Sequence, residues 1–489
     1  MDSLGPFVFI GVANYGPLYI MAMLKKHNFD ARGLFRSLDE IRDMQPVPTF
    51  VGFSCWTGEH RKQYLWAQRV KELFPKCVVC FGGPHAIICP DEIMSQQAVD
   101  MVCVGEGEYT ILELAERLRD RQSLNEIEGL WTKDEAGTVH KTKPRPLVED
   151  LDTLPFMDRS GFVYDAPDSP HSGFQTGRGC VNSCKFCYHN VFRRRFEGRY
   201  FRKRSVDNVI AEIQQACQKY SYASIKFKDD TFIASRSWLR EFADKFPQEV
   251  GLPFIAAVIP SQVDEEVATL LKKAGCISVG LGIESGNDFI RQNILGKRFA
   301  RERIVAAFNA CKNAGIESLV GQWIIANPYE TVETVLESIA LHCELQDRPI
   351  VHFYTPYPGT ETTNRAIREG WLSPEDCEVD SGLLDHIYVR FSEETKLCFY
   401  ELQKLFYLFT PSAALFSAFR EQVLQQANDR TRLRILQKWR KKLEAIHGKV
   451  RPVMDEDTGH IAMLTLAKRP PTSRVRYMLI KIRELMAHL

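Results

Sequence analysis

Short apolar runs that alternate with helical patterns are the feature of this sequence that most restricts its fold. Between residues 7 and 145 such runs occur at 50–54, from Cys77 in the stretch CVVCFGGPH, and at 100–105, with helical patterns such as 60–73 between them. Strands that alternate with helices form parallel β-α-β units. We therefore predict an α/β protein whose N-terminal part is a doubly wound parallel sheet.

A second series of the same kind begins at Phe174. Its strand-like runs lie at residues 224–228, 253–258, 277–281, 318–325 and 351–354. The series predicts a partial or full parallel β/α barrel, a fold in which functional residues gather at the carboxyl ends of the strands. The pattern is mostly helical after residue 375.

These patterns predict four segments. They are a Rossmann-like domain over residues 1–140, a linker rich in Pro and Asp over 141–172, the β/α barrel over 173–375 and a mainly helical C-terminal domain over 376–489. A chain of 489 residues is longer than one core usually serves, which agrees with this division.

Charge, hydropathy and cysteine usage exclude several classes of protein. The formal net charge is +1, so no global field attracts nucleic acid or an anionic membrane, and nucleic acid is not an expected partner. The sequence has no apolar run near 18 residues and no signal-peptide pattern, so we expect no transmembrane helix. Its 14 cysteines are scattered, which favours reduced thiols in a cytoplasmic protein.

A cysteine triplet follows the first strand of the second series. Cys180, Cys184 and Cys187 have the spacing Cys-x3-Cys-x2-Cys within GRGCVNSCKFCYHN. Three thiolates this close fit one [4Fe-4S] cluster and leave one iron without a protein ligand. A zinc site that includes the nearby His189, or three buried thiols, are the alternatives. By contrast, Cys77 and Cys80 lie on a strand, point to opposite faces and are expected in the core.

The run CVNSCKFC, with Phe186 between the last two cysteines, resembles the radical S-adenosylmethionine superfamily. The resemblance implies that the open iron chelates S-adenosylmethionine and reduces it, and that a 5'-deoxyadenosyl radical then removes hydrogen from an unactivated carbon. The motifs KFKDDTF, GLGIESG and QWIIANPYE also resemble those of the family. The resemblance therefore implies that S-adenosylmethionine contacts Phe186, Asp229, Asp230, Glu284, Ser285 and Gln322.

Two of these motifs leave alternatives open. Asp229 and Asp230 could instead cap the helix that follows their strand. In the third motif Ala326 and Tyr329 replace two glycines of the family pattern Ile-Ile-Gly-x-Pro-Gly-Glu. Close approach of a ligand to this backbone is therefore in doubt, and Tyr329 is predicted to shape the substrate pocket.

Glycine turns in the N-terminal region resemble the cobalamin-binding domain of one radical subfamily. They are FGGPH and GEGE, each directly after a predicted strand, where doubly wound sheets bind ligands. The resemblance implies cobalamin contacts at Ser54, Gly82, Gly83, His85, Gly105, Glu106, Gly107 and Glu108. The chain has no Asp-x-His-x-x-Gly motif, so no lower cobalt ligand is evident, and His85 fits a turn better than a cobalt site. A cofactor-free domain used for packing is the alternative.

The resemblance implies methyl transfer to an unactivated carbon or phosphorus of a small-molecule, lipid or tetrapyrrole metabolite. A radical cyclase or rearrangement enzyme without methyl transfer is the runner-up, and an RNA-modifying methylthiotransferase is the second alternative. The basic stretch RRRFEGRYFRKR at residues 193–204 is predicted to contact an anionic substrate or an electron donor such as flavodoxin or ferredoxin, rather than RNA.

Overall fold

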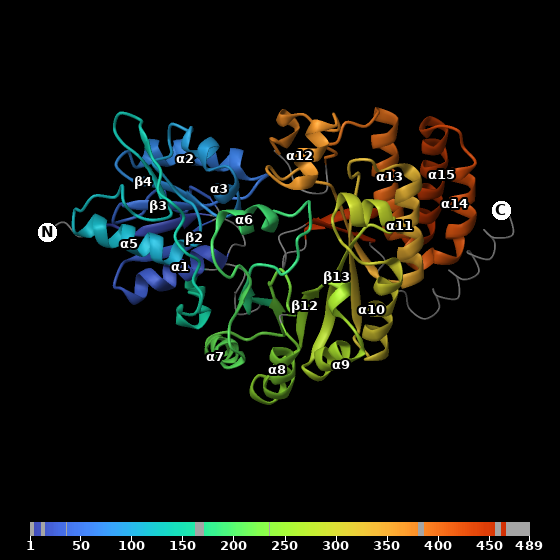
Figure 1. Ribbon diagram of the computed structural model, residues 1–489, viewed down its shortest axis with the longest axis horizontal. Helices are drawn as coiled ribbons and strands as arrows, with labels where there is room; N and C mark the ends of the chain where they lie inside the picture. The colour runs from blue at the N-terminus through green and yellow to red at the C-terminus, as the bar shows by residue number, and fades with distance from the viewer. Residues whose placement is uncertain are drawn as a thin grey trace.

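The computed structural model describes residues 4–10, 15–35, 37–161, 171–233, 235–379, 386–454 and 461–465. Two parallel sheets with helices on their faces follow each other along the chain, and a mainly helical region comes last (Figure 1). The predicted α/β class and the order of its parts are confirmed.

The first sheet has seven strands in the order β2-β1-β3-β4-β5-β6-β7. The first five are mutually parallel, whereas β6 and β7 are antiparallel additions at one edge. The strands are β1 (Phe7–Ile10), β2 (Ala31–Phe35), β3 (Phe50–Ser54), β4 (Val78–Gly82), β5 (Met101–Cys103), β6 (Leu130–Lys133) and β7 (Val139–His140).

Helices cover both faces of this sheet, so its central strands are buried on both sides. Helices α1 (Tyr15–Lys26) and α5 (Gly107–Arg119) pack on one face. Helices α2 (His60–Leu73), α3 (Pro84–Ile88) and α4 (Pro90–Met94) pack on the other. Cys80 belongs to the first of these cores and Cys77 to the second, so the prediction that both are core residues on opposite faces is confirmed.

The segment after β7 runs along the first domain and is anchored to it. It contains the short 3-10 helices η1 (Leu151–Thr153) and η2 (Arg159–Gly161). Leu151, Leu154 and Met157 are buried in the core beneath α1 and α5. The domain boundaries drawn from the sequence stay predictions.

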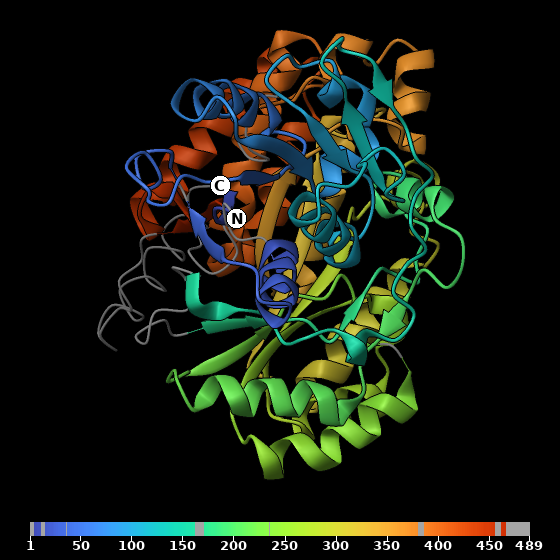
Figure 2. The same ribbon diagram turned by 90° about the vertical axis from the view of Figure 1, so that its left-hand side faces the viewer.

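The second sheet has six parallel strands in the order β15-β14-β13-β12-β11-β8. Each strand pairs with its predecessor along the chain, so the sheet winds in one direction, and β8 and β15 remain as its edges. The sequence predicted a partial or a full barrel, and the structure has the partial barrel. Figure 2 shows this sheet below the first domain, with its helices on the outer side.

The elements of the partial barrel alternate as the sequence pattern indicates. The strands are β8 (His171–Phe174), β11 (Ser224–Phe227), β12 (Phe254–Val258), β13 (Cys276–Glu284), β14 (Ser318–Ile325) and β15 (Arg348–Phe353). The helices are α7 (Val206–Cys217), α8 (Arg236–Glu249), η4 (Pro260–Gln262), α9 (Glu265–Lys273), the π-helix η5 (Ile290–Ile294), α10 (Arg301–Asn313), α11 (Val332–Leu345), α12 (Glu361–Arg368) and η6 (Pro374–Cys377).

The C-terminal region packs on the outside of the barrel. It contains α13 (Glu393–Phe409), η7 (Thr410–Leu415), α14 (Phe416–Leu424) and α15 (Asp429–His447). Phe406, Trp439 and Leu443 join the core of the barrel. The antiparallel pair β16 (Val450–Met454) and β17 (Ile461–Thr465) is an addition that the helical pattern did not predict.

None of the described helices combines the length and the apolar character that crossing a membrane requires.

Candidate active site

The predicted cluster loop follows β8, at the carboxyl end of the second sheet. It begins after β9 (Gly177–Arg178), contains α6 (His189–Arg195) and ends before β10 (Arg202–Lys203). Strands β9 and β10 pair antiparallel, so the two ends of the loop are joined at its base. Arg193 reaches back to the start of the loop and donates hydrogen bonds to the carbonyls of Cys180 and Asn182. Backbone pairing and one arginine thus fix the shape of the loop.

The three cysteines lie on this loop with little exposure. The backbone and side-chain amides of Asn182 both donate to Cys180 Sγ, at 3.5 and 3.6 Å. Burial is the main cause that raises the pKa of the Cys184 and Cys187 thiols. Thiolates in such a place need nearby positive charge, which the irons of a cluster supply. The donor set therefore fits a [4Fe-4S] cluster with three protein ligands.

Strand β13 ends in an ion pair that lies next to the cysteine loop. The Nζ of Lys297 is 2.7 Å from Glu284 Oε1 and donates to the carbonyl of Gly282 at 2.8 Å. Burial opposes the charge of Lys297, but Glu284 and Cys184 outweigh it and raise the Lys297 pKa. A Cβ on Gly282 would lie 2.7 Å from Lys297 Nζ and 2.8 Å from Glu284 Oε1. The glycine therefore makes room for this pair.

Gln322 on β14 lies beside the same strand, since its side-chain amide is 3.6 Å from the Cβ position of Gly280. Glu284, Lys297 and Gln322 thus gather over the glycines of GLGIESG, where the family resemblance puts S-adenosylmethionine. Glu284 has a φ of 69°, an uncommon value for a residue with a side chain, and such strain is typical of functional sites. The cofactor roles of Glu284 and Gln322 stay predictions.

The two aspartates after β11 have different surroundings. Asp229 is buried, accepts hydrogen bonds from the amide and hydroxyl of Thr176 at 3.1 and 2.7 Å, and lies 3.6 Å from Lys203 Nζ. Asp230 is half-exposed and pairs with His189 Nε2 at 2.9 Å. We interpret Asp229 as a residue that positions β8 and β10, and Asp230 as the carboxylate available to a ligand.

Phe186 is partly buried, and Ser285 is fully buried. Phe186 contacts two small apolar clusters, one of which contains Ile290 and Leu295. Ser285 is fully buried, accepts a hydrogen bond from the Asn287 amide at 3.2 Å and lies 3.5 Å from the Ser338 hydroxyl. These contacts fix the turn after β13 and show no open side of Ser285 toward a ligand.

The two positions where the family pattern has glycines keep a glycine-like backbone. Ala326 and Tyr329 have φ values of 58° and 69°, so the loop after β14 takes the left-handed conformation although neither residue is glycine. The Tyr329 ring lies 5.2 Å from the ring of Trp371, and Arg365 stands over it at 4.9 Å. Its hydroxyl is buried and has no hydrogen-bond partner among the described residues. An unpaired hydroxyl in an aromatic wall is consistent with the predicted substrate-pocket role.

A cavity of about 300 Å³ opens between the first domain and the cysteine loop. Its wall from the first domain includes Ser54, Gly82, Gly83, Gly105, Glu106, Gly107 and Glu108. Its other wall includes Gln175, Gly177, Arg178, Gly179, Phe192 and Asp230. The glycine turns and the segment that leads to Cys180 therefore face one another.

Glycines and apolar side chains make up most of the lining of this cavity. The lining also includes Gly52, Cys80 and the apolar side chain of Phe50. Gly83 has a φ of 90°, and a Cβ there would lie 2.9 Å from backbone atoms of Cys55. A turn that only glycine adopts lets the backbone approach a ligand closely. The residues present fit a cobalamin, the group that the sequence motifs indicate.

Glu106 and Glu108 join the two walls through arginines. Glu106 accepts from Arg202 at 2.8 and 3.0 Å and from Arg178 at 3.0 Å, and Arg178 donates to Glu108 at 2.6 Å. The Val148 amide also donates to Glu106, at 2.7 Å. Burial alone would raise the Glu106 pKa, but the two arginines lower it to about 2. These carboxylates are thus engaged within the protein, and their cobalamin contacts stay predictions.

His85 does not line the cavity. Its side chain is buried on the far side of the glycine turn, where its ring stacks on that of His60 with 4.2 Å between centroids. This position argues against a contact with cobalamin and agrees with the interpretation of His85 as a turn residue.

The arginines of the basic stretch have internal partners. Arg194 donates to the Gly359 carbonyl at 3.1 Å, Arg195 to the Ile88 carbonyl at 3.0 Å, and Arg204 to Glu212. The stretch therefore holds the cysteine loop to both domains. These contacts do not support the predicted role in binding an anionic substrate or redox partner.

Sequence reasoning missed Lys297, His189 as the partner of Asp230, and Arg178. Lys297 carries no local motif. His189 was noted only as a zinc alternative, although its place two residues after Cys187 puts it within reach of the cavity wall. Arg178 lies two residues before Cys180, and this position could have indicated that its side chain contacts both walls of the cavity.

Comparisons with known proteins agree with this geometry. A model of the Radical SAM superfamily matches residues 174–342, and a model of the B12 binding domain matches residues 12–115. The chain is 32% identical over 336 residues to the uncharacterized methyltransferase PH0819 of Pyrococcus horikoshii, covering 66% of this chain and 71% of that protein. It is 26% identical to the cytidylyl-2-hydroxyethylphosphonate methyltransferase of Streptomyces wedmorensis, covering 73% of this chain and 78% of the relative.

Among solved structures, the cobalamin-dependent S-adenosylmethionine radical enzyme OxsB with aqua-cobalamin bound has the same fold. Its TM-score is 0.68 at 14% identity, over 99% of this chain and 81% of that chain.

Proposed function

Because the chain belongs to the cobalamin-dependent radical S-adenosylmethionine enzymes, we propose that it methylates an unactivated carbon or phosphorus atom of a small-molecule or lipid metabolite. Its cofactors are a [4Fe-4S] cluster, S-adenosylmethionine and cobalamin. Both relatives described above are methyltransferases by name, which favours methyl transfer over cyclisation.

The observation that carries the proposal is the shared cavity. The glycine turns at Gly82 and Gly105 form one wall of the cavity. Arg178 and Gly179, directly before Cys180, form part of the other wall. A cofactor held by the first wall therefore faces the space beside the cysteine loop. An enzyme that abstracts hydrogen and then delivers a methyl group needs both reagents at one substrate atom.

Each part of the site has a separate task in this proposal. When bound, the cluster supplies the electron that cleaves S-adenosylmethionine, and cobalamin supplies the methyl group. Cys180, Cys184 and Cys187 hold the cluster, while Glu284 and Lys297 offer one carboxylate and one ammonium to the polar end of S-adenosylmethionine. Apolar side chains such as Phe9, Ile20 and Phe53 line part of the cavity and limit contact of a bound cofactor with water.

Tyr329 in the loop after β14, Trp371 just after α12 and Arg365 on α12 form an aromatic wall with one cation. We place the substrate against this wall. An aromatic surface with a guanidinium suits a substrate that is partly apolar and carries an anionic group. This assignment replaces the basic stretch at residues 193–204 as the expected anion contact.

The electron donor is proposed to be a flavodoxin or ferredoxin. Val181, next to Cys180, is 45% exposed, so the cysteine loop has an apolar side chain at the surface where a small redox protein could dock. Reduction of the holoenzyme by purified flavodoxin, followed by loss of the cluster's oxidised absorbance, tests this, with a Val181→Glu variant expected to slow it.

Isotope labelling tests the reaction class. The holoenzyme is incubated with S-adenosylmethionine deuterated in its methyl group and with candidate substrates chosen from the products of neighbouring genes. Deuterium in the product supports methyl transfer. 5'-Deoxyadenosine with an unlabelled, altered product instead indicates a cyclase or rearrangement enzyme, and sulfur in the product indicates a methylthiotransferase.

A further inference from the structure

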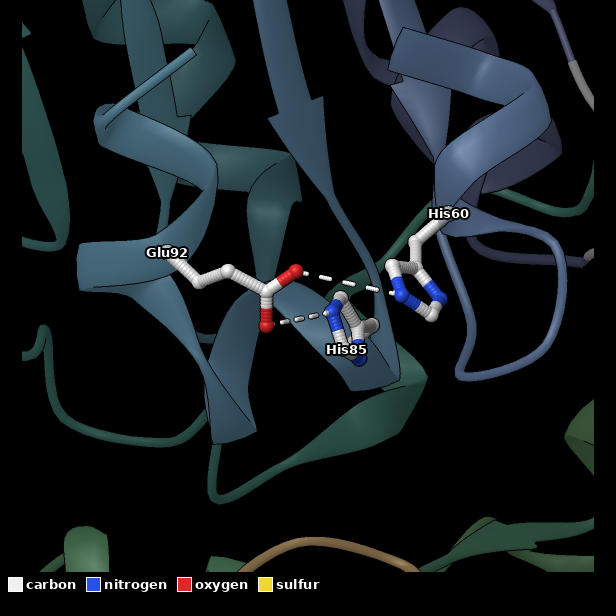
Figure 3. A group of neighbouring side chains, drawn as sticks. All are labelled: His60, His85 and Glu92. Carbon is white, nitrogen blue, oxygen red and sulfur yellow. Dashed lines mark ion pairs between the residues drawn. The ribbon is translucent and has the colours of Figure 1, made fainter. Parts of the chain in front are cut away.

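Three side chains of the first domain form a polar group that the proposed reaction does not use. His60 begins α2, His85 lies in α3 and Glu92 lies in α4, so three helices on one face of the sheet converge at this point (Figure 3). The nitrogen and oxygen atoms that could bind an ion all lie within 4.8 Å of one another. The group is separate from the cysteine loop and does not line the cobalamin cavity.

The imidazole of His85 faces a carboxylate without a hydrogen bond. Nε2 is 3.5 Å from Glu92 Oε2, is buried and has no hydrogen-bond partner among the described residues. Nδ1 is 2.9 Å from Thr57 Oγ1, and in the tautomer that donates the Nδ1 proton to this hydroxyl, Nε2 carries a lone pair. A lone pair and a carboxylate repel each other unless a cation lies between them. That cation is either a proton or a metal ion.

The other two side chains are placed to complete a metal site. His60 Nε2 is 3.8 Å from Glu92 Oε1, and Tyr64 donates its hydroxyl proton to the same oxygen at 3.0 Å. Donor atoms around tetrahedral zinc, with bonds of about 2.0–2.1 Å, are about 3.3–3.4 Å apart. The 3.5 and 3.8 Å separations join the two histidines to different oxygens of Glu92, whose side chain is 45% exposed. Because the two imidazoles are stacked and a metal ion binds in the plane of each ring, ligation requires rotation of Glu92 and of one imidazole.

One existing contact changes when a metal binds. The Gly58 amide donates to His60 Nδ1 at 3.2 Å, so the proton of the neutral ring is on Nε2. Ligation by Nε2 moves this proton to Nδ1 and gives up one long hydrogen bond. The exchange is favourable because a metal–imidazole bond is much stronger than a long neutral hydrogen bond.

We propose that His60, His85 and Glu92 bind a divalent transition-metal ion, with Zn²⁺ as the fitting ion. Two imidazoles and one carboxylate suit zinc, whereas magnesium and calcium prefer sites made of oxygen alone. Tyr64 orients the carboxylate from the second layer, as outer hydrogen bonds do in metal sites.

The position of the group indicates a structural ion. His85 lies two residues after Gly83, whose turn lines the cobalamin cavity, and His60 lies six residues after Ser54, which ends β3 and lines the same cavity. An ion bound to both histidines ties the loops after β3 and β4 to each other and braces this wall of the cavity. It is a third metal, distinct from the cluster iron and the cobalt.

Metal analysis of the holoenzyme tests the proposal. Reconstituted enzyme, in which the cluster occupies the cysteines, is incubated with Zn²⁺, passed through a desalting column and analysed for zinc, iron and cobalt by mass spectrometry. Wild-type protein and a His140→Ala control, which removes an exposed histidine paired with Asp134, are expected to retain one zinc per chain. Glu92→Gln and His85→Asn are expected to lose it, and Tyr64→Phe to bind it about tenfold more weakly.

A second measurement separates metal binding from misfolding. Zn²⁺ is expected to raise the Tm of the wild type by mass action and to leave the Tm of Glu92→Gln unchanged. Glu92 is half-exposed, so this isosteric variant is expected to fold and to keep its iron. Absence of zinc in the wild type, or equal zinc retention or an equal Tm rise in Glu92→Gln, would overturn the proposal and leave a proton as the cation. Zinc content is independent of methyl transfer, so the two proposals fail separately.

Discussion

Replacing Glu106 by Gln should release the first domain from the cysteine loop. Glu106 accepts hydrogen bonds from Arg178, Arg202 and the Val148 amide, and its side chain is 17% exposed. The lowering of its pKa from 4.5 to about 2 corresponds to about 3 kcal/mol, since one pKa unit is about 1.4 kcal/mol. Removal of one partner from a buried ion pair costs a similar amount, about 3–5 kcal/mol. We therefore expect a loss of about 3 kcal/mol.

Hydrogen exchange measures this loss where it occurs. The chain has more than one domain, so a single global unfolding midpoint is not a clean measure. Exchange of the Val148 amide and of the amides of β9 reports local opening of the contact. A loss of about 3 kcal/mol corresponds to exchange about 100-fold faster. Amides in the core of the barrel, such as those of β13, are expected to keep their rates.

A double-mutant cycle identifies the cause. Glu106→Gln, Arg202→Met and the double variant should give a coupling of at least about 1.5 kcal/mol, because the carboxylate divides its interaction among three donors. The exposed pair Arg301–Glu344 is the matched control and should give less than about 1 kcal/mol. Equal coupling in the two cycles would refute the assignment of Glu106 as the residue that joins the walls.

The sign of the pH dependence gives an independent check. The folded-state pKa of Glu106 is depressed, so its stabilisation is fully present above the unfolded value of 4.5 and is lost as the pH falls toward about 2. The difference between wild type and Glu106→Gln should thus be constant from pH 8 to above pH 5 and shrink below pH 4.5. A difference that changes between pH 6 and 8 would show that another group is involved.

Three further changes have defined outcomes. Cys184→Ala should reduce the iron of reconstituted enzyme from about four per chain to near zero and abolish 5'-deoxyadenosine formation; retained cleavage would contradict the cluster assignment. Gly83→Ala should lower the free energy of unfolding by about 1–3 kcal/mol and weaken cobalamin binding, because φ is 90° at this position and the new Cβ would meet the Cys55 backbone. Gly137 has open space around its Cβ position, so Gly137→Ala is the control. An absorbance titration should show unchanged cobalamin binding in this control. Burial raises the pKa of Glu330 to about 8, so the carboxyl opposes folding increasingly as the pH rises from 4.5 to 8. Glu330→Gln should therefore become more stable than wild type by about 3–5 kcal/mol above pH 8. Hydrogen exchange of the β14 amides in the two proteins, compared at pH 5 and at pH 8.5, would refute this if it showed no such divergence.

The parts of the fold that sequence could predict are those with a local cause. The runs at β3, β4 and β14 consist mostly of large apolar residues, so both their identity and their order were evident. Strand β2, with Arg32 and Gly33 in a five-residue run, has too weak a pattern to be found. The pair β16 and β17 was missed because it follows a long basic helix.

The site divides in the same way. The cysteine triplet and the turn at Gly82 and Gly83 follow from residues adjacent in sequence. The pairings of Glu284 with Lys297 and of Glu106 with Arg202 join residues that no spacing rule relates, because the fold alone brings them together. The basic stretch was predicted to contact an anionic substrate or an electron donor because its internal acceptors, which include backbone carbonyls, carry no sequence signal.

The hairpin of β9 and β10 has a consequence for recombining proteins of this kind. Arg178 and Arg202 lie opposite each other in this hairpin, and both bind Glu106 of the first domain. The same hairpin closes the loop that carries the cysteines. A chimera with a foreign N-terminal domain and a junction in the linker would therefore take Glu106 from one parent and Arg178 and Arg202 from the other. A unit that keeps these contacts extends past Lys203, so a chimera should take its N-terminal domain and its cysteine loop from the same parent.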